Sequence, residues 1–170
     1  MTRPALLLAL LAAPALADDR VVEPGTPLTP DDAAHVFAHT CLVPADELEA
    51  SAEDLVVSGA MQPMDPISEG EPGMRYSTPD GLAILRVEAH DGGASCEMGV
   101  STDAGDLGPV LEESLASHVA TLAPQGAEDE GLAAGRAWLW EEDGTPHRVE
   151  MLSVDDGFLL RALSGDAMEG

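Results

Sequence analysis

The spacing of apolar residues predicts two amphipathic helices. The first is expected to begin at Thr29, whose hydroxyl can cap a helix, with Pro30 at the first helical position. Pro44 is expected to close it, and residues 45–54 suit one further acidic turn or a short helix. A second helix is predicted from about Leu107 to Leu122. The apolar faces comprise Ala33, Val36, Phe37, Thr40 and Cys41 in the first helix, and Leu107, Val110, Leu111, Leu115, Val119 and Leu122 in the second.

Elsewhere the pattern changes to short alternating runs separated by turn residues, which predicts strands. Pro79-Asp80-Gly81, Asp143-Gly144 and Asp155-Asp156-Gly157 are strong turn signals. A Gly-rich acidic loop is expected over Ala123–Gly135. The predicted strands are Leu55–Met61, Met74–Thr78, Leu82–His90, Ala94–Ser101, Arg136–Glu142, Pro146–Val154 and Phe158–Ser164.

This order of elements predicts an α+β domain in which two helices pack on one face of an antiparallel, meander-type sheet. The connections are short and show no alternating strand–helix–strand rhythm, which favours antiparallel over parallel pairing. The single domain is expected to span residues 29–164. Residues 18–28 are expected to form a flexible lead-in, and residues 165–170 a frayed tail.

Residues 1–17 have the pattern of a secretory signal peptide. Met1–Pro4 includes the basic Arg3, Ala5–Ala13 is apolar, and Ala15-Leu16-Ala17 resembles a cleavage site. We therefore expect a periplasmic or secreted protein, exported by a cleavable signal. No second apolar run approaches the ~20 residues of a spanning helix, so no membrane insertion is expected after cleavage.

The composition is strongly acidic and limits the classes of partner. The chain has 32 Asp and Glu residues, all seven of its basic residues are arginine, and its formal charge is −25. Such a surface repels phosphate groups, so we expect no nucleic acid partner. The charge keeps an exported protein soluble, and it also attracts cationic partners.

Two cysteines, Cys41 and Cys96, are predicted to form a disulfide. Cys41 lies on the apolar face of the first helix, and Cys96 lies on the apolar side of the strand Ala94–Ser101. Those two faces must pack on each other, and thiols of exported proteins are expected to be oxidised. Two reduced buried thiols or a metal pair are the alternatives.

Asp31, His35 and His39 form a candidate metal site. Their spacing of four places them on one stripe of the first helix, beside its apolar face. Imidazoles one turn apart can chelate Zn²⁺ or Cu²⁺, and Asp31 can add an oxygen. The alternative is a pair of solvated histidines with no cofactor. His118, beside the second helix's apolar stripe, is interpreted as packed or peripheral.

Trp138, Trp140 and Arg136 share one side of a predicted strand and form a candidate binding face. Exposed indole rings would offer a platform for a sugar, a peptide or a cation. Buried, they would be part of the core under the helices, which is the favoured interpretation because large residues usually point inward.

The sequence contains none of the catalytic motifs considered. Without lysine there is no Schiff base, no S-x-x-K nucleophile and no P-loop, and neither G-x-S-x-G nor G-x-G-x-x-G occurs. We therefore expect a protein that is not an enzyme.

With its signal peptide, a cysteine on the first helix and a second on a mid-chain strand, the chain resembles small exported bacterial proteins of unknown function. That resemblance implies no activity. The expected function is a protein-binding or envelope accessory factor, with another envelope protein as its partner. The alternative is a divalent metal-binding protein that uses Asp31, His35 and His39.

Overall fold

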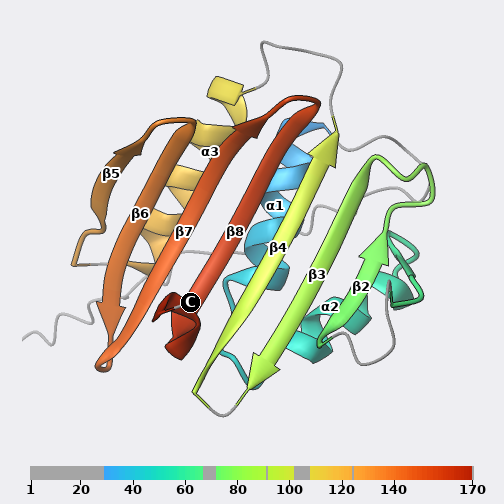
Figure 1. The fold of residues 1–170 in the computed structure, drawn as a ribbon, viewed down its shortest axis with the longest axis horizontal. Helices are drawn as coiled ribbons and strands as arrows, with labels where there is room; N and C mark the ends of the chain where they lie inside the picture. Colours follow the sequence, from blue (N-terminus) through green and yellow to red (C-terminus); the bar gives the residue numbers. More distant parts are fainter. Residues whose placement is uncertain (1–28, 67–71, 91, 102–107, 124, 170) are drawn as a thin grey trace, which may run out of the picture.

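The computed structural model describes residues 29–66, 72–90, 92–101, 108–123 and 125–169. The predicted signal peptide and lead-in lie outside these residues. Within them, eight strands form one antiparallel sheet in the order β1-β2-β3-β4-β8-β7-β6-β5 (Figure 1). The strands are β1 (Gln62–Pro63), β2 (Met74–Ser77), β3 (Ala83–His90), β4 (Gly93–Ser101), β5 (Glu128–Leu132), β6 (Gly135–Glu142), β7 (Thr145–Val154) and β8 (Gly157–Gly165).

Three α-helices lie together behind this sheet: α1 (Pro30–Cys41), α2 (Leu48–Val57) and α3 (Gly108–Leu122) (Figure 1). As the sequence predicts, Thr29 caps α1. Its hydroxyl accepts from the Asp32 backbone N–H, and the Asp32 carboxylate accepts from the Thr29 backbone N–H. The α+β class is confirmed, and α2 overlaps residues 45–54, for which the sequence suggests one further turn or a short helix.

The core fills the space between the helices and the sheet. α1 contacts β4, α2 contacts β3, and α3 contacts both α1 and β7. The longer strands β3, β4, β6, β7 and β8 contribute alternate residues to this core and turn the others to the opposite face, which carries no α-helix and which we call the helix-free face. The largest fully buried side chains include Phe37, Leu48, Leu85, Met98, Leu111, Leu115 and Leu160.

Within the described residues, the chain passes twice through a helical segment followed by a four-stranded antiparallel meander. α1 and α2 precede β1-β2-β3-β4, α3 precedes β5-β6-β7-β8, and the last strands of the two meanders pair with each other at the centre of the sheet. The paired residues Glu97 and Arg161 lie at the middle of this β4–β8 seam. The two meanders thus meet at the centre of a single sheet, and one face of that sheet carries the helices.

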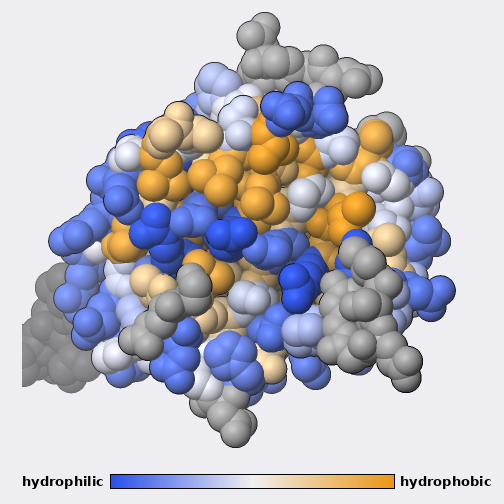
Figure 2. Space-filling model, viewed as in Figure 1, coloured by the Kyte–Doolittle hydropathy of each residue, from blue (hydrophilic) through white to orange (hydrophobic). Residues whose placement is uncertain are grey.

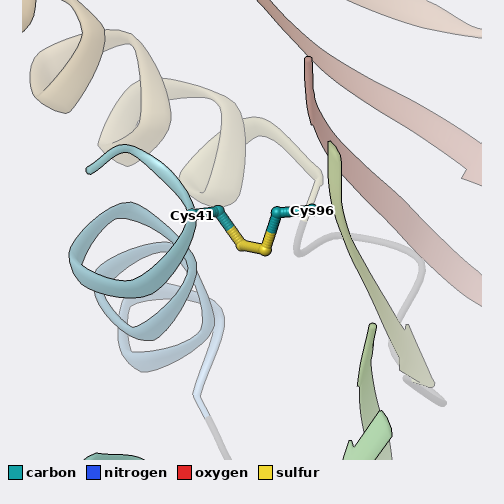
Figure 3. Close-up of a disulfide and its surroundings, with 2 residues drawn as sticks. All are labelled: Cys41 and Cys96. Atoms are coloured by element: carbon teal, nitrogen blue, oxygen red, sulfur yellow. A yellow bond between two sulfur atoms is a disulfide. The ribbon is translucent and has the colours of Figure 1, made fainter. Parts of the chain in front are cut away.

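The predicted disulfide is confirmed. Cys41 at the C-terminal end of α1 joins Cys96 on β4, with 5.4 Å between their Cα atoms and 55 residues of sequence between them (Figure 3). Both half-cystines are buried. The bond therefore links the helix layer to the sheet inside the core.

Two secondary-structure predictions are wrong. Residues 55–57 end helix α2 and do not begin a strand, because Leu48 and Ala52 bury one face of a continuous helix that extends to Val57. Strand β5 lies inside the predicted acidic loop. It has no apolar alternation to reveal it, since it is an exposed edge strand held by pairing with β6.

At the C-terminal end, where the sequence predicts a frayed tail, Asp166–Glu169 form a short 3₁₀ helix. The Asp166 backbone N–H donates to the Gly92 carbonyl, and the helix contacts β4, β7 and β8. No helix in the described part of the chain is both long and apolar enough to cross a membrane.

Candidate functional site

A row of charged residues crosses the helix-free face of the sheet. Register places Arg75, Arg86, Glu97, Arg161 and Glu150 side by side on β2, β3, β4, β8 and β7. We call these residues, with Arg148 and Glu130, the charged belt. Figure 2 shows the belt as a blue band between apolar areas.

Ion pairs hold much of the belt in place. Glu150 is the most buried member. It accepts from Arg148 Nε at 2.6 Å and lies 3.5 Å from Arg161 Nη1. Arg161 Nε also lies 2.7 Å from Glu97, and Arg148 Nη1 lies 3.1 Å from Glu130. These interlocking pairs fix the side chains and therefore the shape of this face.

The cations of the protein are concentrated on this face. Four of the five arginines in the described ranges, Arg75, Arg86, Arg148 and Arg161, belong to the belt. Within the same ranges, no ion pair is found for Arg75 at the β2 end. In a chain with a formal charge of −25, this end of the belt is therefore a local cationic position.

An apolar strip runs beside the belt. Ile84, Leu159 and Leu152 lie on the same row of the helix-free face, and Leu82 and Val154 are exposed near its ends. Gly99, between Ile84 and Leu159, has nothing within 4 Å of the position where a Cβ would stand. The strip is visible in Figure 2 as the orange area along the upper part of the sheet.

On the other side of the molecule, the predicted Asp31, His35 and His39 stripe does lie on one side of α1, and α3 brings His118 to it. The ring centroids of His35 and His39 are 4.1 Å apart, and the His118 centroid lies 6.1 Å from each. Ser114, one turn earlier on α3, donates a hydrogen bond of 2.9 Å to Asp31. We call Asp31, His35, His39 and His118 the imidazole cluster.

The imidazole cluster lines a cavity of about 380 Å³ between α1 and α3. Burial lowers the pKa of His118, and the nearby His39 lowers it further, while the Asp31 carboxylate opposes both effects. In the described ranges, no three His, Cys, Asp or Glu side chains stand ready in the geometry of a metal centre.

His118 could not be assigned to the candidate metal site from the sequence, because nothing in a single chain shows which helix faces meet. Its only signal is its position beside the apolar stripe of α3, three residues after the buried Leu115. The helix–helix contact between α1 and α3 converts a stripe on one helix into a cluster shared by two.

Trp138, Trp140 and Arg136 lie on the helix side of β6. Trp138 is only 5% exposed and belongs to the core. Arg136 is paired with Glu112 of α3 and with Asp129 of β5, and its guanidinium carbon lies 5.8 Å from the Trp138 ring centroid. Arg136 therefore ties the sheet to α3, and Trp138 has no open ring face to offer to a ligand.

Trp140 is half-buried and borders a second cavity of about 670 Å³ at the C-terminal end of α1. Its ring stacks on His147, with centroids 5.1 Å apart and planes 10° from parallel. The disulfide lines the same cavity. Burial lowers the pKa of His147, while the Glu142 carboxylate opposes this effect.

The lowered pKa of His147 predicts a loss of stability on acidification. Because the unfolded chain binds the proton more tightly than the folded chain does, the contribution is intact above the unfolded value near 6.5 and is lost as the pH falls towards the folded pKa. We expect the urea midpoint to fall between pH 7.5 and 5.0, and to fall less in His147→Phe, which keeps an aromatic ring against Trp140. An identical fall in the two proteins would contradict this assignment.

No protein-family model matches this chain, and neither does any curated protein or solved structure. The resemblance to small exported bacterial proteins therefore stays a prediction.

Proposed function

We propose that this is an exported, non-enzymatic accessory protein that binds another envelope protein through the helix-free face of its sheet. The observation that carries the proposal is the concentration of arginines and exposed aliphatic residues on this one face. The disulfide supports export, since such bonds persist in oxidising compartments.

The chemistry of the face indicates which side chains the partner presents. The apolar strip offers aliphatic side chains and a shallow step at Gly99, which suits a row of apolar side chains on the partner. Arg75 and Arg86 are adjacent at one end of the belt, where Arg86 pairs only weakly with Glu88 at 3.4 Å. We therefore infer that the partner presents a carboxylate beside its apolar row, which pairs with this cationic end of the belt.

The face is suited to binding because it is ordered before a partner arrives. Arg148 and Arg161 are already held by Glu97, Glu150 and Glu130, so these two arginines have little side-chain entropy to lose on association. Aliphatic residues beside a fixed polar rim are typical of protein interfaces.

The test compares matched variants in capture from envelope extract. Ile84→Asp places a charge in the strip, and Arg75→Glu reverses the cation that has no ion pair among the described residues. Val110→Asp is the control, since Val110 is 48% exposed on α3 against 38% for Ile84 on the sheet. We expect one partner to be retained at least tenfold more by the wild type and Val110→Asp than by either face variant.

The other outcomes would overturn the proposal. Equal retention by all four proteins would remove the helix-free face as the docking surface. A wild-type dimer that Arg75→Glu dissociates, seen by sedimentation, would make the occupant a second copy of this chain. Turnover of a substrate by the purified protein would contradict its non-enzymatic character.

A further inference from the structure

We propose that the imidazole cluster binds one late first-row divalent ion, Zn²⁺ or Cu²⁺, between α1 and α3. The ligands are His35 and His39 from α1 and His118 from α3, and Asp31 supplies negative charge in the same cavity. This inference is independent of the proposed docking function, because the cluster lies in the helix layer and the docking face is the opposite side of the sheet.

The donor set of the cluster suits a late first-row divalent ion. Three imidazoles are the ligands that Zn²⁺ and Cu²⁺ favour, whereas Ca²⁺ and Mg²⁺ take oxygen ligands. Sequence spacing accounts for two of the three rings, His35 and His39. The third ring, that of His118, lies 79 residues after His39 in the chain and is brought to the cluster by the packing of α3 on α1.

The three imidazole rings lie close enough together to bind one ion. Rings bound to one zinc ion have centroids at most about 6.5 Å apart, since each Zn–N bond is about 2.1 Å and a ring nitrogen lies about 1.1 Å from its centroid. The three observed separations, 4.1, 6.1 and 6.1 Å, fall inside that limit. No other arrangement of histidines in the described ranges is this compact, since the other ring contact of a histidine is the His147 stack on Trp140.

The three rings do not yet have the separations of a closed metal centre, and the change in separation that is required is small. A tetrahedral ion sets ring centroids about 5.3 Å apart, so each separation must change by about 1 Å. His39 is exposed and can turn about its side-chain torsions, while His35 and His118 are more enclosed. The cavity of about 380 Å³ leaves room for the ion and for a water or small anion as its fourth ligand.

The Asp31 carboxylate supplies negative charge close to the three imidazoles. A dication is costly to place between helices unless carboxylate charge lies close by. Asp31 lies in this cavity and is oriented by the Ser114 hydroxyl, which donates to one of its oxygens at 2.9 Å. An ion held by these three imidazoles would join the middle and last turn of α1 to the C-terminal half of α3.

The test is calorimetric titration of the full chain with Zn²⁺ and, separately, with Cu²⁺ at pH 7.5. We expect one ion per chain, and at least tenfold weaker binding in His118→Gln. His90→Gln is the matched control, because His90 is exposed at the end of β3 and away from the cluster. The Cu²⁺ complex should also show nitrogen hyperfine splitting in its electron paramagnetic resonance spectrum, reduced in His118→Gln.

The carboxylate-rich surface supplies the main competing explanation. If millimolar Ca²⁺ displaces the bound Zn²⁺, the ion is held by surface oxygens and the proposal fails. It also fails if His118→Gln and His39→Gln bind as tightly as the wild type. Because His39 is exposed, His39→Gln keeps the test decisive should His118→Gln not fold.

Discussion

Removal of the disulfide is expected to lower the free energy of unfolding by about 4 kcal/mol, measured as the difference between the wild type and Cys41→Ala/Cys96→Ala in urea. The bond closes a loop of 55 residues, and opening it returns that loop's conformational freedom to the unfolded chain. A single domain is typically stable by only about 5–15 kcal/mol, so the disulfide supplies a large share of the free energy of unfolding.

Reduction provides the control for this prediction. Dithiothreitol should lower the urea midpoint of the wild type and leave that of the double variant unchanged. Alanine is chosen over serine because both cysteines are buried and a hydroxyl there would lack a hydrogen-bond partner. A wild-type midpoint that does not respond to reductant, with both thiols shown to be free, would contradict the prediction.

Leu85→Ala is expected to cost about 2–5 kcal/mol, whereas its neighbour Ile84→Ala should cost at most about 1 kcal/mol. Leu85 is 0% exposed in the core between β3 and the helices, so its truncation leaves a cavity there. Ile84 is 38% exposed on the helix-free face, and its truncation leaves no enclosed space.

The measurement is chemical unfolding of both variants beside the wild type. Because the two substitutions are adjacent on one strand, differences in strand propensity and register are nearly the same for both. Similar losses in the two variants would mean that another layer covers the helix-free face. The Ile84→Ala protein should also remain folded, which would support the use of Ile84→Asp in the binding experiment.

Local chemistry made several elements predictable. The capping box at Thr29 and Asp32, and the turn at Pro79-Asp80-Gly81, depend on residues close in sequence. In that turn, Asp80 accepts from both the Thr78 hydroxyl and the Leu82 backbone N–H. The disulfide was predictable for a related reason, since both cysteines lie on apolar faces that have to meet.

Elements that depend on contacts between residues far apart in the chain could not be predicted from the sequence. Strand β5 exists because β6 supplies hydrogen bonds and Arg136 pairs with Asp129, and nothing in its own residues indicates a strand. Val56 and Val57 favour a strand by composition, but tertiary packing of Leu48 and Ala52 keeps them in α2.

The amino-acid sequence alone determined the α+β class, the inner and outer faces of most elements, and the two cysteines that join. Each of these follows from short-range periodicity, which a single chain displays directly. The tertiary structure decided the strand order, and with it the charged belt, because residues become neighbours across a sheet only when the pairing is known. It also brought His118 to His35 and His39, since the contact between two helix faces depends on how both pack on the sheet.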